Sequence, residues 1–300
     1  MNTKINLAGV ELKNPVMTAS GTFGSGMEYS EFVDLNKLGA VVTKGVANVP
    51  WPGNPTPRIA ETYGGMINAI GLQNPGIDVF CERDIPFLKK YDTKIIVNVC
   101  GKSERDYVEV VERLAGEPVD MLEINISCPN VKEGGIAFGQ NAANIEHITK
   151  AIKNVAKQPV IMKLSPNVTD ITEMAKAAEA GGADVLSLIN TITGMKIDIN
   201  RQTFAVANKT GGLSGPAVKP VAVRMVYQVA NAVKIPIIGM GGIATAEDAL
   251  EFILAGATAV SIGTANFHNP RTTLEVIEGI EKYMVNKGVF DINDLIGIVK

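Results

Sequence analysis

The sequence predicts one domain, residues 1–300, built as a (β/α)₈ barrel in which parallel strands form the core and helices cover them. Short runs rich in Val and Ile recur along the chain, which is typical of strands buried on both faces of a parallel sheet. A helix-like segment follows each run, and several of these segments end at glycine, as helices commonly do. Because single barrel domains of about 250 residues are common, a chain of 300 residues needs no second domain.

Eight runs fit the strand pattern. In chain order they are residues 15–20, 40–45, 94–99, 121–127, 159–165, 184–190, 235–242 and 258–265. Between them, residues 103–116, 170–183 and 245–257 have the apolar spacing of amphipathic helices. The last of these begins at Thr245 and has Asp248 three positions later, a spacing that indicates an N-terminal cap.

Three connections are longer than a barrel requires, at residues 46–75, 128–141 and 190–217. Each follows a strand, so each is expected at the C-terminal face, where barrel enzymes build their sites. Residues 1–14 are expected to form a small hairpin that covers the barrel, and residues 284–300 a C-terminal appendage. The expected fold is therefore a TIM barrel with an N-terminal β-hairpin and long βα loops on the C-terminal face.

Composition argues against several classes of function. A net charge of −3 gives no general attraction for nucleic acid or anionic lipid. The sequence has no run of 18 apolar residues and no signal-peptide core, so we expect a cytoplasmic protein without a membrane segment. Three cysteines without a C-x-x-C pair and two isolated histidines predict no metal site, and an iron–sulfur cluster on this chain would need four thiolates.

Polar residues and glycines collect at the ends of the predicted strands. They are Ser20, Lys44, Asn98, Asn125, Cys128, Lys163, Asn190, Thr191, Gly241, Gly242, Gly263 and Thr264. A barrel brings these ends into one ring. Asparagine amides suit a flat neutral heterocycle with alternating carbonyl and N–H groups, and a lysine can pair with a carboxylate on the same ligand. Glu123 shares strand parity with Asn125, so it is expected to point into the barrel as a structural carboxylate that needs a partner.

Two glycine turns, in residues 239–249 and 261–266, predict a phosphate site. Backbone N–H groups exposed at glycine, together with a helix N-terminus, bind phosphate, and barrels commonly place such a site after the seventh and eighth strands. The first turn also fits the dinucleotide fingerprint G-x-G-x-x-A. That interpretation is disfavoured because the match falls in the seventh unit and no acidic residue ends the next strand.

The lysines and the cysteine leave alternatives open. Lys163 beside a flavin ring would stabilise the reduced flavin, whereas Lys163 or Lys44 could instead form a Schiff base, as in an aldolase-type lyase. A non-catalytic phosphate-binding subunit is a third hypothesis. Cys128 taken alone is most simply a small buried hydrophobic residue.

Several motifs together carry a resemblance to a known family. They are NPVMTASGTFG, VVTKGV, PWPGNPTPRIAETYGGMINAIGLQNPG, INISCPNV, VIMKLSPNVTDI, LINT, GGLSGPAVKP, IIGMGGI and SIGTA. Across residues 3–285 the chain resembles the dihydroorotate dehydrogenases, most closely class 1B, the catalytic subunit of the NAD-linked bacterial form. MINAIGLQNPG and NISCPN are the most specific of these motifs.

The resemblance implies an FMN-dependent oxidation of (S)-dihydroorotate to orotate in de novo pyrimidine (UMP) biosynthesis. The implied flavin contacts are Ser20, Lys44, Gly45, Asn98, Asn125, Lys163, Ile189, Gly215, Gly241, Gly242, Gly263 and Thr264. The implied substrate contacts are Lys44, Asn68, Ala69, Ile70, Gly71, Leu72, Asn125, Asn190 and Thr191, with Asn130 as a further amide. Cys128 matches the catalytic base that removes the C5 proton. The glycine pair within residues 129–140 suits a hinge, so we expect this loop to be a lid that brings the thiol over the substrate, with an ordinary surface loop as the alternative.

The resemblance also implies partners. Electrons would pass to NAD⁺ through a second subunit that carries FAD and a 2Fe-2S cluster, with this chain as a homodimer inside a heterotetramer. A class 1A-like enzyme that passes electrons to fumarate remains the nearest alternative.

Overall fold

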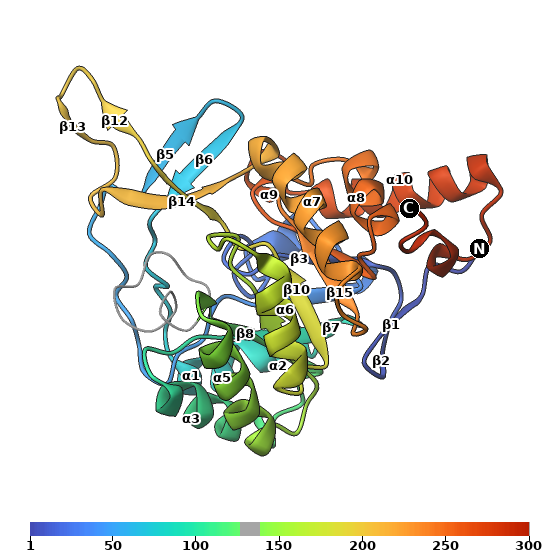
Figure 1. Cartoon of the computed structure of the whole chain (residues 1–300), viewed down its shortest axis with the longest axis horizontal. Helices are drawn as coiled ribbons and strands as arrows, with labels where there is room; N and C mark the ends of the chain where they lie inside the picture. The colour runs from blue at the N-terminus through green and yellow to red at the C-terminus, as the bar shows by residue number, and fades with distance from the viewer. Residues whose placement is uncertain (127–138, 300) are drawn as a thin grey trace.

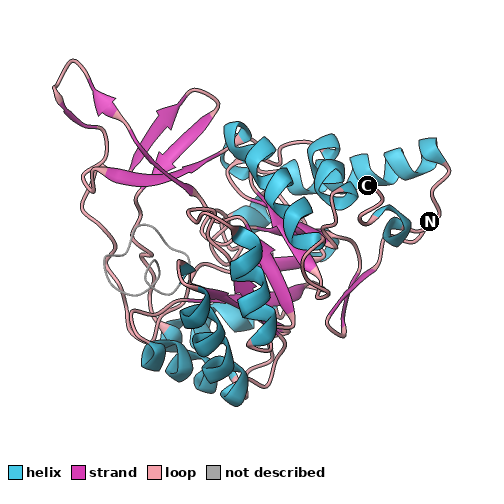
Figure 2. Cartoon of the chain, viewed as in Figure 1, coloured by secondary structure: helices cyan, strands magenta, loops and turns pink. Residues whose placement is uncertain are grey.

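The computed structural model describes residues 1–126 and 139–299. Its core is a closed barrel of eight parallel strands in the order β10-β15-β16-β3-β4-β7-β8-β9, which is chain order around the ring. Figures 1 and 2 show helices packed against these strands. The barrel strands are β3 (Val16–Thr18), β4 (Ala40–Val42), β7 (Lys94–Val99), β8 (Met121–Asn125), β9 (Val160–Lys163), β10 (Val185–Leu188), β15 (Ile237–Met240) and β16 (Ala259–Ile262). Each lies within one of the eight predicted runs, so the predicted barrel is confirmed.

Helices pack around the outside of this barrel. They are α1 (Ile77–Val79), the π-helical turn η3 (Phe80–Asp84), α2 (Ile85–Leu88), α3 (Glu104–Leu114), α5 (Ala142–Val155), α6 (Ile171–Ala180), the 3-10 turn η4 (Pro216–Val218), α7 (Lys219–Ala230), α8 (Ala246–Leu254), α9 (Ala265–His268) and α10 (Thr272–Lys287). The predicted cap of α8 is confirmed, because Thr245 and Asp248 form a reciprocal capping box.

The first unit departs from the predicted alternation. Residues 19–39, between β3 and β4, contain two 3-10 turns, η1 (Tyr29–Glu31) and η2 (Leu35–Lys37), in place of an α-helix. Gly21, Gly24 and Gly26 all have positive φ in this connection, a conformation that interrupts a right-handed helix.

The barrel strands are buried on both faces, which explains their Val- and Ile-rich composition. Every residue of β4, β9 and β16 is buried, for example. Helical side chains such as Tyr107 of α3 and Phe252 of α8 are fully buried in the same core cluster as strand residues. Burial of such apolar surface is the main stabilising term for a fold of this kind.

Two of the long connections form a second sheet that the sequence did not predict. Its strands are β5 (Ile59–Thr62), β6 (Gly65–Asn68), β11 (Ile192–Met195) and β14 (Thr210–Ser214), in the antiparallel order β11-β14-β6-β5. A small hairpin, β12 (Ile197–Asp198) with β13 (Thr203–Phe204), extends from it. Figure 1 shows this sheet projecting beyond the barrel.

The two ends of the chain lie against each other. The predicted N-terminal hairpin is present as β1 (Ile5–Leu7) and β2 (Val10–Leu12). The expected appendage begins later than predicted, because α10 continues to Lys287 and ends at Gly288 in the left-handed conformation. The 3-10 turn η5 (Ile292–Leu295) follows, and Asn2 bridges to Asp291. No helix within residues 1–126 and 139–299 is long and apolar enough to cross a bilayer.

Candidate active site

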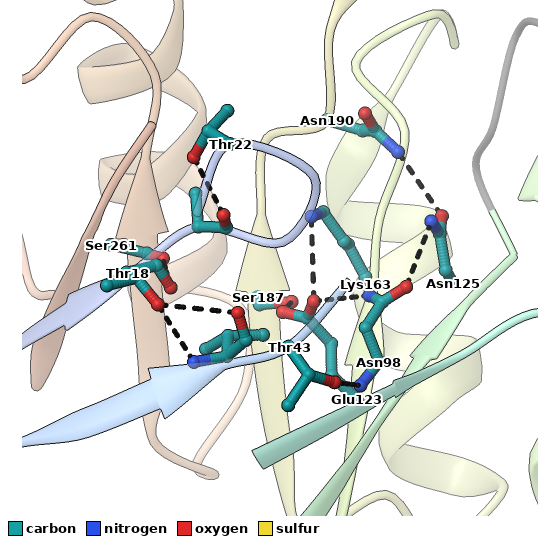
Figure 3. A network of polar contacts seen from close by, with 12 residues as sticks. Thr18, Thr22, Thr43, Asn98, Glu123, Asn125, Lys163, Ser187, Asn190 and Ser261 are labelled. Carbon is teal, nitrogen blue, oxygen red and sulfur yellow. Dashed lines mark hydrogen bonds and ion pairs between the residues drawn. The ribbon is translucent and has the colours of Figure 1, made fainter. Parts of the chain in front are cut away.

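Polar side chains from neighbouring strands meet at the C-terminal rim of the barrel. Asn125 and Lys163, the last residues of β8 and β9, are register partners. Asn98 of β7 is the register partner of Glu123, two residues before Asn125. All four residues are buried, and Figure 3 shows their side chains converging. The structure therefore brings together predicted site residues from three strands.

Glu123 lies at the centre of this group. One carboxylate oxygen, Oε1, accepts a hydrogen bond of 2.6 Å from Asn98 Nδ2 and lies 3.5 Å from Lys163 Nζ. The other, Oε2, accepts a hydrogen bond of 2.8 Å from Ser187 Oγ. The side chain of Glu123 is 1% exposed, which confirms the expected inward orientation and the need for partners.

The three asparagines form a chain of amides across the rim (Figure 3). Asn125 Nδ2 donates to Asn98 Oδ1 at 3.5 Å, and Asn190 Nδ2 donates to Asn125 Oδ1 at 3.3 Å. The backbone is held as well, because the hydroxyl of Tyr107 on α3 donates to the carbonyl of Asn125 at 2.8 Å. Each amide is thereby fixed in one orientation.

Lys44 and Gly45 follow β4 on the neighbouring side of the rim. The backbone N–H of Lys44 donates to the carbonyl of Gly24, and a Cβ at Gly21 would lie 3.7 Å from Lys44 Nζ. A Cβ at Gly45 would lie only 3.0 Å from Asn98 Oδ1, so glycine permits this close approach. Lys44 therefore stands near the turn that follows β3, where half-buried Ser20 also lies.

The predicted substrate segment, residues 68–72, begins at the end of β6. Asn68 Nδ2 donates to the carbonyl of Gly212 on β14 at 3.4 Å, and Ala69 N–H donates to the carbonyl of Arg58. The carbonyl of Ile70 accepts from the backbone of residue 54. Gly71 and Leu72 both have positive φ, and Leu72 packs with Trp51 and Cys100 beside the rim. The second sheet thus carries this segment to the site.

Asn167 is a rim residue that the sequence analysis did not single out. Its Nδ2 donates to the carbonyl of Thr191 at 3.0 Å, and its Oδ1 accepts from Thr193 N–H at 2.9 Å. Thr191 N–H also donates to Asn190 Oδ1 at 2.8 Å. The only sequence signal for Asn167 was its place in the motif VIMKLSPNVTDI, because Thr191 and Thr193 lie more than 20 residues away along the chain.

The predicted phosphate turns also come together. A Cβ at Gly242 would lie 2.8 Å from the carbonyl oxygen of Gly215, and Gly215, Gly241 and Gly242 all have positive φ. Thr264, directly after Gly263, donates from Oγ1 to Ser214 Oγ at 2.7 Å. The backbone of Ile189 joins the same region by donating to the carbonyl of Met240.

The N-terminus of α8 is already capped by its own side chains. Asp248 Oδ2 accepts from the N–H groups of Ala244 and Thr245 at 2.9 and 3.0 Å, and Thr245 Oγ1 accepts from Asp248 N–H at 3.3 Å. Lys219 of α7 donates to Asp248 Oδ1 at 2.6 Å, which joins the two helices. These three N–H groups therefore already have partners within the chain, and the phosphate site at the glycine turns stays a prediction.

Cys128 and Asn130 lie outside the described residues, as does most of the 129–140 loop. Cys81 and Cys100, to which we assign no chemistry, are both buried. Burial is the main cause that raises the pKa of the Cys81 thiol to about 11, with Glu117 adding to it.

The chain is similar to known dihydroorotate dehydrogenases. The family model for dihydroorotate dehydrogenase matches residues 2–284. The chain is 76% identical over 300 residues to a protein of Lachnoclostridium phytofermentans named dihydroorotate dehydrogenase B (NAD(+)), catalytic subunit, covering 100% of both. It is 67% identical over 296 residues to a protein of the same name from Alkaliphilus oremlandii, covering 99% of this chain and 98% of that one.

A solved structure matches the fold. The crystal structure of DHODH from Eimeria tenella in complex with ferulenol has a TM-score of 0.83 at 25% identity, covering 99% of this chain and 88% of that one. With the family model matched over nearly the whole length, the chain belongs to the dihydroorotate dehydrogenase family.

Proposed function

We propose that this chain oxidises (S)-dihydroorotate to orotate in de novo pyrimidine (UMP) biosynthesis, with FMN as its resident cofactor. The observation that carries the proposal is the convergence of Lys163, Asn98, Asn125 and Asn190 on one rim of a barrel of this family. We take residues 1–300 as one flavin-binding domain.

The donor set at the rim fits a flavin. The isoalloxazine ring presents carbonyl oxygens and a ring N–H, which a lysine ammonium and asparagine amides complement. A phosphate needs close approach of backbone N–H groups, which glycine permits, and a Cβ at Gly242 would lie 2.8 Å from the carbonyl oxygen of Gly215. The proposed flavin contacts are Ser20, Lys44, Gly45, Asn98, Asn125, Lys163, Ile189, Gly215, Gly241, Gly242, Gly263 and Thr264. When bound, FMN supplies the acceptor for the hydride from C6 of the substrate.

The remaining rim residues suit the substrate. We infer that Lys44 pairs with the substrate carboxylate, while the amides of Asn68, Asn125 and Asn190 bind the carbonyl and N–H groups of the ring. Segment 69–72 and Thr191 complete the proposed substrate site. Bound in this way, the substrate would have one ring face available to the flavin and the other available to a base.

Cys128 is the proposed base. Formation of the double bond of orotate requires loss of a proton from C5 and of a hydride from C6. We propose that the Cys128 thiolate takes the C5 proton and that the hydride goes to the flavin. Because a free thiol titrates near pH 8.5, this role requires nearby positive charge or hydrogen-bond donors.

We further propose that electrons leave through a partner. Relatives are named as catalytic subunits of an NAD(+)-linked enzyme, which supports an electron-transfer subunit carrying FAD and a 2Fe-2S cluster, NAD⁺ as terminal acceptor, and a cytoplasmic heterotetramer around a homodimer of this chain. A Schiff-base lyase is less well supported. The family model and the relatives cited above are named for a dehydrogenase and not for a lyase.

An anaerobic titration of the yellow protein with dihydroorotate tests the proposal. Wild-type flavin should bleach, and Cys128→Ala should retain FMN and orotate but lose most single-turnover reduction near neutral pH. Cys81→Ala is the matched control and should reduce normally. A colourless folded protein that ignores added FMN would refute the flavin enzyme, and full reduction in Cys128→Ala would refute the base.

A further inference from the structure

Glu123 is a buried carboxylate to which the proposed chemistry gives no part. Its side chain is 1% exposed, and Lys163 beside it is 6% exposed. Moving an ionised carboxylate out of water is strongly unfavourable unless cations and hydrogen-bond donors compensate, and an apolar side chain of similar volume often stabilises a protein as well or better. Packing alone therefore does not explain a glutamate at this position.

The contacts of Glu123 come from strands on both sides of β8. Asn98 on β7 and Ser187 on β10 donate to its two oxygens at 2.6 and 2.8 Å, and Lys163 on β9 places Nζ 3.5 Å from Oε1 (Figure 3). Two of these three partners are proposed flavin contacts. Glu123 thus touches the residues that hold the ring without belonging to the proposed contact set.

The direction of the amide chain follows from Glu123. An ionised carboxylate only accepts hydrogen bonds, so the amide of Asn98 must turn its NH₂ group toward Glu123 and its oxygen away. That oxygen accepts from Asn125, whose own oxygen accepts from Asn190. Reversing any one of these amides would place two donors or two acceptors against each other.

We propose that Glu123 is a positioning residue that fixes the Asn98 amide and acts as counter-ion to Lys163, thereby setting the reduction potential of the flavin. This inference rests on the proposed function, since it requires a flavin beside Lys163. A lysine alone would favour the anionic reduced flavin, and a carboxylate against the same ammonium offsets that effect. The consequence is a lower potential, which favours transfer of electrons to the next acceptor.

The test is the midpoint potential of the flavin, measured by anaerobic dye equilibration on the purified holoenzyme. Glu123→Gln keeps the shape but removes the charge, so its potential should shift to a more positive value. Ser187→Ala, the matched control, removes one hydrogen bond from Glu123 without changing charge and should leave the potential unchanged. Glu123→Asp keeps the charge and should stay closer to wild type than Glu123→Gln does.

An unchanged or more negative potential in Glu123→Gln would overturn the inference, while a wild-type protein without flavin would overturn the proposed function itself. A second measurement covers a Glu123→Gln variant that loses flavin or folds poorly. Because a lone buried ammonium is destabilising, adding Lys163→Gln should restore thermal stability to that variant. Strictly additive losses in this double-mutant cycle would overturn the role of Glu123 as counter-ion.

Discussion

Replacement of Gly242 by alanine tests the proposed phosphate turn. Its φ is +79°, a left-handed conformation that costs an alanine about 1–2 kcal/mol. The new Cβ would also lie 2.8 Å from the carbonyl oxygen of Gly215 and 3.0 Å from the backbone nitrogen of Lys219. Backbone atoms must move to relieve these overlaps, which adds about 1–3 kcal/mol as in other overpacked sites.

Gly288 offers the matched control. Its φ is +67°, but nothing lies within 4 Å of a Cβ built there, so Gly288→Ala has the backbone strain without the overlap. Denaturant unfolding should show a loss of about 1–2 kcal/mol for Gly288→Ala and about 2–5 kcal/mol for Gly242→Ala.

Flavin affinity separates the two variants further. If moving the turn removes about 1.4 kcal/mol of binding free energy, FMN binds about tenfold more weakly, whereas Gly288→Ala should bind FMN normally. A fluorescence titration of the apoprotein with FMN measures both dissociation constants. Equal constants for the two variants would refute the assignment of this turn to the phosphate.

Three further predictions concern other parts of the molecule. A Cβ at Gly212 would lie 2.0 Å from Thr191 Oγ1, whereas a Cβ at Gly194 would make only ordinary van der Waals contacts. In a calorimetric titration, Gly212→Ala should therefore weaken orotate binding severalfold, and the control Gly194→Ala should not. Equal affinities of the two variants would contradict the proposed substrate role of Thr191. Burial raises the pKa of Asp248, but hydrogen bonds from a lysine and backbone N–H groups outweigh it and leave the pKa below its usual value. Asp248→Asn should therefore cost about 1 kcal/mol of stability at pH 7, and this difference should disappear as the pH falls through the lowered pKa; a loss that is independent of pH would count against this account. Because the pKa of Cys81 is raised to about 11, its thiol stays protonated at pH 8 and should react with iodoacetamide far more slowly than in the unfolded chain, as peptide mapping would show; equal rates would contradict its burial.

The barrel could be predicted from sequence because its strands are buried on both faces. Runs such as residues 94–99 and 159–165 consist mostly of Val, Ile, Leu and Met, a pattern that depends only on local composition. The inward orientation of Glu123 followed from its parity with Asn125 on the same strand. The gathering of polar strand ends followed from barrel closure alone.

The second sheet could not be predicted in the same way. Its central pairing joins Asn68 to Gly212 across more than 140 residues, and no local pattern specifies such a register. The partners of Glu123 were missed for a similar reason, because parity gives the face of a strand but not which neighbouring side chains reach it. The side chain of Asn167 donates to the carbonyl of Thr191, and its backbone N–H donates to Ser165 Oγ. Neither contact has a sequence pattern that would have predicted it.

The pairing of β6 with β14 has a consequence for engineering. Each of the two long connections supplies two strands of one sheet. The two connections meet where β6 of the first pairs with β14 of the second. Transplanting one connection from a distant homologue without the other would leave unsatisfied strand edges, which invite aggregation. Engineering of substrate specificity in this chain should therefore replace both long connections together.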